Sequence, residues 1–229
     1  MGEFSNFFYE HFLKRGVDYK TWCRQLEEQG WEWKGEGAFG VAYVHPNKNY
    51  IYKLFQDDPG YSFFLKFALA NQKDPGVVKL KRIILTGSKI PDGYLSDYSI
   101  PNVIAMEKLE PLRLDKKSSN MLFDVSATIL HRMGTIYEKG MTFEQAIDAL
   151  AAYVEKNDQE YSSVLYDIRI RKILRAPFIL KTPVFRTIYN LFVYKTNNRG
   201  ENIQWDIHSG NLMYRPSTKT IVLTDPFVG

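Results

Sequence analysis

Cysteine is almost absent from this chain of 229 residues, in which Cys23 is the single example. One cysteine cannot form a disulfide within the chain, and it rules out a zinc site built from several thiolates. No run of about eighteen apolar residues is present, and the N-terminus has no basic segment followed by a long apolar stretch. We therefore expect neither a membrane span nor a secretory signal, and by default a cytoplasmic protein.

An excess of charge is also missing. The chain has 30 basic and 26 acidic residues, which gives a net charge of +4. That excess is too small to indicate nucleic-acid binding by itself. Hydrophobic residues make up 45% of the chain and charged residues 24%, so the composition is that of a soluble globular protein with one domain or two small lobes.

The side-chain pattern divides the chain into three parts. Residues 1–30 have aromatic and aliphatic side chains at helical spacing and end at Gly30, which predicts a helical N-terminal extension. Residues 31–112 predict short strands and one helix over Tyr61–Asn71, whereas residues 113–229 predict mainly helices. One helix is expected over Ser118–Met133, and a second begins at the capping pair Thr142 and Gln145. A third is expected after Asp158, and a fourth begins at Thr182-Pro183.

One run near the C-terminus, Trp205 to Asn211, carries residues with a recognisable chemistry. Asn211 follows Asp206 by five residues, and Asp225 follows Asn211 by fourteen. Phosphoryl transfer needs a carboxylate to orient the acceptor hydroxyl and oxygen ligands for magnesium, and the protein-kinase signature has Asp, Asn and Asp in this order. The segment Leu212–Leu223 predicts two short strands around a turn, which would return Asp225 to Asn211.

A second motif lies far upstream. Gly35, Gly37 and Gly40 fit the pattern G-x-G-x-x-G, and Lys53 follows Gly40 by thirteen residues. Glycines let backbone amides approach phosphate oxygens closely. The same pattern occurs in dinucleotide-binding folds, but there a helix follows directly. Here residues 41–44 predict a strand, and the next strand carries Lys53, which is the kinase arrangement.

With both motifs present, the chain resembles the early serine/threonine protein kinases of short-tailed coliphages, within the protein-kinase-like superfamily. The resemblance lies in Gly35–Pro46, Asp206–Asn211 and Thr224-Asp225-Pro226. It implies a two-lobed α+β protein-kinase-like fold, with a β-rich N-lobe over 31–112 and a mainly helical C-lobe over 113–229. Because the sequence ends at Gly229, four residues after Asp225, we expect this C-lobe to be truncated or minimal.

The resemblance implies an ATP- and Mg²⁺-dependent phosphotransferase, encoded by a phage, that modifies host bacterial proteins in the cytoplasm. Asp206 would orient the acceptor hydroxyl and accept its proton, and Asn211 and Asp225 would hold Mg²⁺. Lys53 would bind the α- and β-phosphates. His208 would either contact the γ-phosphate or brace the loop by hydrogen bonds.

The resemblance also implies where adenine would bind. Met106 would lie behind the ring and Met213 beneath it. Backbone groups of Glu107 and of Lys108 or Leu109, in the segment that connects the lobes, would bind the edge of the ring. The phosphates would lie against Gly35, Gly37 and Gly40.

The partner of Lys53 is left open by the sequence. Kinases normally pair this lysine with a glutamate on the following helix, but Tyr61–Asn71 contains no acidic residue. Either Asp57, Asp58 or Asp74 substitutes, or Lys53 is oriented without an ion pair.

Two other functions remain open. The missing glutamate and the short C-terminal part motivate a pseudokinase that binds nucleotide and acts by docking to a partner. The stretch His208-Ser209-Gly210 also resembles the loop of aminoglycoside phosphotransferases, which keeps a small-molecule substrate as an alternative.

Overall fold

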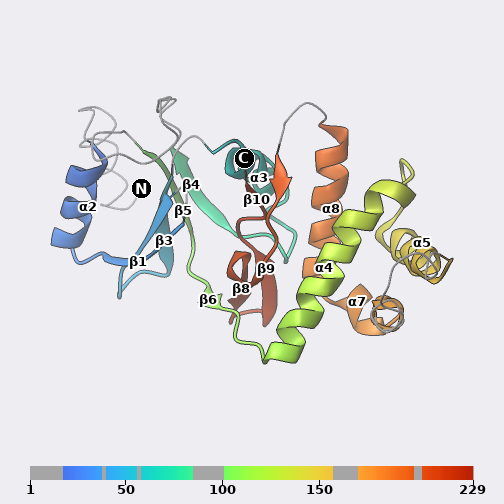
Figure 1. The fold of residues 1–229 in the computed structure, drawn as a ribbon. Coiled ribbons are helices and arrows are strands. Elements are labelled where there is room, and N and C mark those ends of the chain that lie inside the picture. Colours follow the sequence, from blue (N-terminus) through green and yellow to red (C-terminus); the bar gives the residue numbers. More distant parts are fainter. Residues whose placement is uncertain are drawn as a thin grey trace. The chain divides into compact units, whose positions relative to one another are not determined.

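The computed structural model describes residues 18–37, 40–55, 58–84, 101–156, 170–198 and 203–228. Its architecture is α+β, with antiparallel sheets and helices, as expected. The chain forms two compact units (Figure 1). Unit 1 contains the described residues up to Ser62 together with Lys79–Lys108, and unit 2 contains Phe63–Val78 and Leu109–Val228. Helix α3 (Pro59–Ala70) therefore begins in unit 1 and ends in unit 2.

Unit 1 is built on an antiparallel sheet with the strand order β1-β2-β3-β5-β4. The strands are β1 (Glu32–Gly37), β2 (Gly40–Val44), β3 (Tyr50–Phe55), β4 (Leu80–Ile84) and β5 (Asn102–Glu107). Helix α2 (Tyr19–Glu28) begins after Asp18, whose Oδ1 accepts the N–H of Thr21 at 2.8 Å. Trp22 and Leu26 of α2 are fully buried in one core with side chains of the sheet. Helix α2, which lies in the predicted helical N-terminal extension, belongs to unit 1.

Unit 2 holds the remaining described helices. They are α4 (Lys116–Ile136), α5 (Phe143–Lys156), α7 (Pro177–Lys181) and α8 (Pro183–Asn197), and residues 170–174 are helical as well. Helix α8 lies beside α4 (Figure 1). It also contacts the start of α5, because the hydroxyl of Tyr189 donates to the carbonyl of Met141 and its ring packs on Phe143.

The predicted helix starts have mixed outcomes. The capping pair is confirmed, since the N–H of Thr142 donates to Gln145 Oε1 at 2.8 Å and the N–H of Gln145 donates to Thr142 Oγ1 at 3.2 Å. Helix α8 begins at Pro183 as predicted, but the hydroxyl of Thr182 does not cap it. That hydroxyl donates to the carbonyl of Phe178 at 2.8 Å, because α7 ends there. The stretch directly after Asp158, where another helix is expected, lies outside the described residues.

Two small sheets complete unit 2. The predicted hairpin is confirmed, with β8 (Leu212–Arg215) antiparallel to β9 (Thr220–Leu223), and β6 (Glu110–Pro111) pairs with β8. A short ladder joins β7 (Gln204–Trp205) to β10 (Phe227–Val228). Within the described ranges, no helix has the length and apolar character needed to cross a membrane.

The N-terminus of α4 gives a pH-dependent prediction. Asp115 Oδ1 accepts the N–H groups of Lys117 and Ser118 at 2.9 and 3.0 Å. The hydroxyl of Ser118 and then these N–H groups lower the pKa of the Asp115 carboxyl. Because the folded-state pKa is lowered, this stabilisation is present above the unfolded-state pKa of about 4 and is lost as the pH falls through the folded value.

We therefore expect Asp115→Asn, which keeps an oxygen acceptor for the cap, to lose less stability than wild type when the pH falls below about 4. Urea unfolding at a series of pH values measures this difference. Equal slopes for the two proteins would contradict the assignment.

Candidate functional site

The two aspartates of the C-terminal motif lie next to each other because of the short β7–β10 ladder. Asp206 directly follows β7 and Asp225 lies two residues before β10, with Trp205 opposite Phe227 in the ladder. The N–H of Asp206 donates to the carbonyl of Pro226 at 2.8 Å. Hydrogen bonds therefore join the backbone next to Asp206 to the backbone next to Asp225.

Asn211 is hydrogen-bonded to both Asp206 and Thr224. Its side-chain Nδ2 donates to the carbonyl of Asp206 at 2.6 Å and lies 3.3 Å from Asp206 Oδ2. Its own carbonyl accepts two bonds from Thr224, one from the N–H and one from the hydroxyl, each at 3.0 Å. Because Asp225 follows Thr224, the structure brings Asp206, Asn211 and Asp225 together within unit 2.

The oxygens of this cluster fit a hard divalent cation. Asn211 uses its amide nitrogen to bond Asp206, so its Oδ1 is the atom left for a metal. Oδ1 of Asp225 is buried, whereas the side chain of Asp206 is 46% exposed. Among the described residues no group of three or more His, Cys, Asp or Glu side chains forms a metal cage. One carboxylate and one amide oxygen suit Mg²⁺, which takes its other ligands from water and phosphate.

His208 is a bracing residue in this structure. Its Nδ1 accepts the N–H of Gly210 at 3.0 Å, and its Nε2 lies 3.6 Å from Asp206 Oδ2. A side chain at position 210 would place its Cβ 2.7 Å from the His208 ring, so glycine allows the ring to fold over the turn. Contact of His208 with a γ-phosphate stays a prediction.

The glycine motif forms the β1–β2 hairpin of unit 1. Gly37 pairs with Gly40, and residues 38–39 at the tip lie outside the described part of the chain. A Cβ at Gly40 would come within 2.4 Å of the carbonyl oxygen of Leu54, so the packing against β3 requires glycine there. A Cβ at Gly35 would meet no atom within 4 Å. Gly40 therefore has a structural role, and contact of the glycines with phosphate stays a prediction.

Lys53 lies in the middle of the sheet in unit 1, between Ala42 and Ile104 on the neighbouring strands. Its Nζ is 3.6 Å from the centre of the Tyr61 ring, close enough for a cation–π interaction. Tyr61 is buried at the start of α3 and packs edge-on against Phe55. The sequence pattern did not predict the contact of Tyr61 with Lys53, because an aromatic residue in an apolar helix usually indicates only core packing.

Two of the aspartates considered as partners of Lys53 have hydrogen bonds in the described part of the structure. Asp58 is buried and its Oδ1 accepts the N–H of Tyr61 at 2.9 Å, which caps α3. Asp74 is bound in unit 2, where its Oδ1 accepts the hydroxyl of Thr187 at 2.7 Å and the N–H of Gly76 at 2.8 Å. Asp57 lies outside the described residues.

The segment predicted to bind adenine ends β5. Met106 is buried in the sheet. The N–H of Glu107 donates to the carbonyl of Lys79 at 2.9 Å, and the N–H of Lys108 donates to the carbonyl of Asn49 at 3.2 Å. A backbone N–H for adenine would therefore have to come from Leu109. In unit 2, Met213 lies on β8 opposite Val222.

No model of a known protein family matches this chain. A comparison with curated proteins finds no significantly similar sequence.

Proposed function

We propose that this chain is an ATP- and Mg²⁺-dependent serine/threonine protein kinase with a protein-kinase-like fold, of the kind that short-tailed coliphages use to modify host proteins. In this proposal unit 1 is the N-lobe and unit 2 is a small C-lobe. Unit 1 supplies the glycine hairpin and Lys53 for the phosphates, and unit 2 supplies the groups that act on the acceptor and the metal.

The observation that most supports the proposal is the hydrogen-bonded cluster of Asp206, Asn211 and Asp225. Each of these residue types is common in turns, so the two spacings alone are weak support. In this chain, however, Asp206 is hydrogen-bonded to Asn211 and to Pro226, Asn211 is hydrogen-bonded to Thr224, and the oxygens of Asn211 and Asp225 suit Mg²⁺.

The proposed reaction transfers the γ-phosphoryl group of ATP to a serine or threonine hydroxyl. The bond from the γ-phosphorus to its bridging oxygen breaks, ADP takes the bonding electrons, and the acceptor oxygen bonds to phosphorus. The hydroxyl proton passes to Asp206, which is exposed enough to meet a substrate. Mg²⁺, when bound, neutralises the charge on the phosphates.

Incubation with γ-labelled ATP, Mg²⁺ and a bacterial lysate tests the proposal. We expect label on serine or threonine of lysate proteins. Label on aminoglycosides or sugars but not on proteins would assign the chain to the small-molecule alternative. Nucleotide binding without any transfer would leave the pseudokinase, and neither binding nor transfer would reject a nucleotide-dependent function.

Tyr61 gives a prediction about nucleotide affinity. Because its ring faces the ammonium of Lys53, we expect Tyr61→Leu to weaken binding of Mg²⁺ and an ATP analogue by roughly tenfold, whereas Tyr61→Phe keeps the ring and binds as wild type. Calorimetry measures both affinities. Tyr61→Leu should cause no further loss in a Lys53→Met background, and an equal loss there would show that Tyr61 acts through core packing instead.

A further inference from the structure

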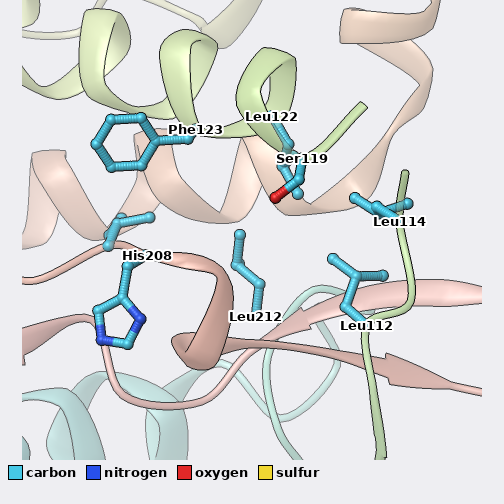
Figure 2. Close-up of a pocket in the computed structure, with 8 residues that line it drawn as sticks. Leu112, Leu114, Ser119, Leu122, Phe123, His208 and Leu212 are labelled. Carbon is cyan, nitrogen blue, oxygen red and sulfur yellow. The ribbon is translucent and has the colours of Figure 1, made fainter. Parts of the chain in front are cut away.

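A pocket of about 230 Å³ opens in unit 2 beside the loop that carries Asp206. Figure 2 shows its walls, which come from the segment before α4, from the first turns of α4, and from the loop before β8 together with the first residue of that strand. Six of the lining side chains are apolar: Leu112, Leu114, Leu122, Phe123, Ile207 and Leu212. Two polar side chains, Ser119 and His208, complete the lining.

The pocket and the carboxylate of Asp206 share a residue. His208 lines the pocket, and its Nε2 is 3.6 Å from Asp206 Oδ2. Ile207, between them in sequence, is buried and lines the pocket as well. The pocket therefore lies next to the residue that contacts the Asp206 carboxylate.

We propose that this pocket binds an apolar side chain of the protein substrate, at a position close in sequence to the phosphorylated serine or threonine. The inference rests on the proposed function. An apolar cavity of about 150 Å³ holds a benzene molecule, so 230 Å³ has room for a leucine or phenylalanine side chain. An extended peptide advances about 3.4 Å per residue, which is close to the 3.6 Å between Asp206 Oδ2 and His208 Nε2, so a residue near the acceptor in sequence can span that distance.

The chemistry of the lining selects this occupant. Aminoglycosides and sugars carry hydroxyl or amino groups on most carbons, and six of the eight lining side chains offer these groups no hydrogen-bond partner, whereas Ser119 and His208 offer one each. A leucine side chain has no polar atoms to satisfy. Phe123 and Leu114 are 48% and 39% exposed, so a bound side chain would also cover apolar surface that now faces water.

A degenerate peptide library with a central serine or threonine tests the proposal, with each flanking position fixed in turn as leucine, phenylalanine, alanine, lysine or aspartate. We expect leucine or phenylalanine at one or two flanking positions to raise kcat/KM about tenfold over alanine. Phe123→Ala removes one wall of the pocket, and Ser119→Met fills it. In both variants, the ratio of kcat/KM for leucine or phenylalanine to kcat/KM for alanine should fall towards one.

Phe178→Ala is the matched control, because Phe178 is also a partly exposed phenylalanine on a helix of unit 2 but does not line the pocket. It should keep the full ratio. Transfer to peptides with no apolar preference in wild type, or a preference that survives both pocket variants, overturns the inference and leaves the proposed function standing.

Two other outcomes also decide the matter. A dimer that Phe123→Ala dissociates would assign the pocket to a second copy of the chain and overturn the inference. Absence of both nucleotide binding and transfer overturns the proposed function, and the inference with it.

Discussion

Replacing Asp206 with alanine is expected to reduce phosphate transfer by about 100- to 10,000-fold, the usual contribution of a positioned general base. Nucleotide binding should be nearly unchanged. We expect transfer and nucleotide binding to respond differently because two hydrogen bonds of residue 206 involve only its backbone. Asn211 Nδ2 donates to the carbonyl of residue 206 at 2.6 Å, and the N–H of residue 206 donates to the carbonyl of Pro226. Both bonds survive loss of the carboxylate, so the oxygens of Asn211 and Asp225 that we propose to hold Mg²⁺ should keep their places.

Single-turnover transfer from γ-labelled ATP and calorimetric binding of an ATP analogue, measured on the same samples, test this expectation. Asp148→Ala removes an exposed carboxylate on α5 and serves as the control. Wild-type transfer rates in Asp206→Ala would remove Asp206 from the reaction. Loss of nucleotide binding together with transfer would show that Asp206 holds the nucleotide or the loop rather than the acceptor proton.

Arg215→Met is expected to cost about 3 kcal/mol of unfolding free energy, the largest stability effect that we predict. Arg215 is 5% exposed, and its guanidinium donates to the carbonyls of Pro75 at 2.6 Å and Val77 at 2.9 Å. The N–H of Leu223 bonds the carbonyl of Gly76 in the same segment. The arginine therefore connects the segment after α3 to the β8–β9 hairpin, which ends two residues before Asp225.

Arg186→Met is the matched control for this substitution. Arg186 is 46% exposed and pairs with Glu144 on the surface, so its loss should cost less than about 1 kcal/mol. Urea unfolding of both variants measures the two effects. If Arg215→Met unfolds at the wild-type urea concentration, the buried hydrogen bonds have no net stabilising role.

Local patterns predicted local structure well. The Thr142 and Gln145 pair marked the start of α5, and the two short runs on either side of Arg215–Lys219 predicted the hairpin between β8 and β9. These features depend on residues a few positions apart. The cluster of Asp206, Asn211 and Asp225 was foreseeable for the same reason, since one hairpin and one short ladder bring its members together.

Features formed by distant residues could not be predicted in this way. Arg215 looks like an ordinary residue before a turn, and its acceptors lie 140 and 138 residues away in the chain. Thr182 has the residue type of a cap, but the preceding helix α7 supplies a carbonyl that takes its hydroxyl. The apolar pocket likewise draws on residues from 112–123 and 207–212, and nothing in either segment alone indicates a cavity.

The most direct test of the account is a crystal structure of the chain with Mg²⁺ and a non-hydrolysable ATP analogue. We predict a metal ion about 2.1 Å from Asn211 Oδ1 and from a carboxylate oxygen of Asp225, with the triphosphate bound to that ion and to Lys53. A metal or triphosphate bound away from Asn211 and Asp225 would contradict the assignment of a kinase-like site to this chain.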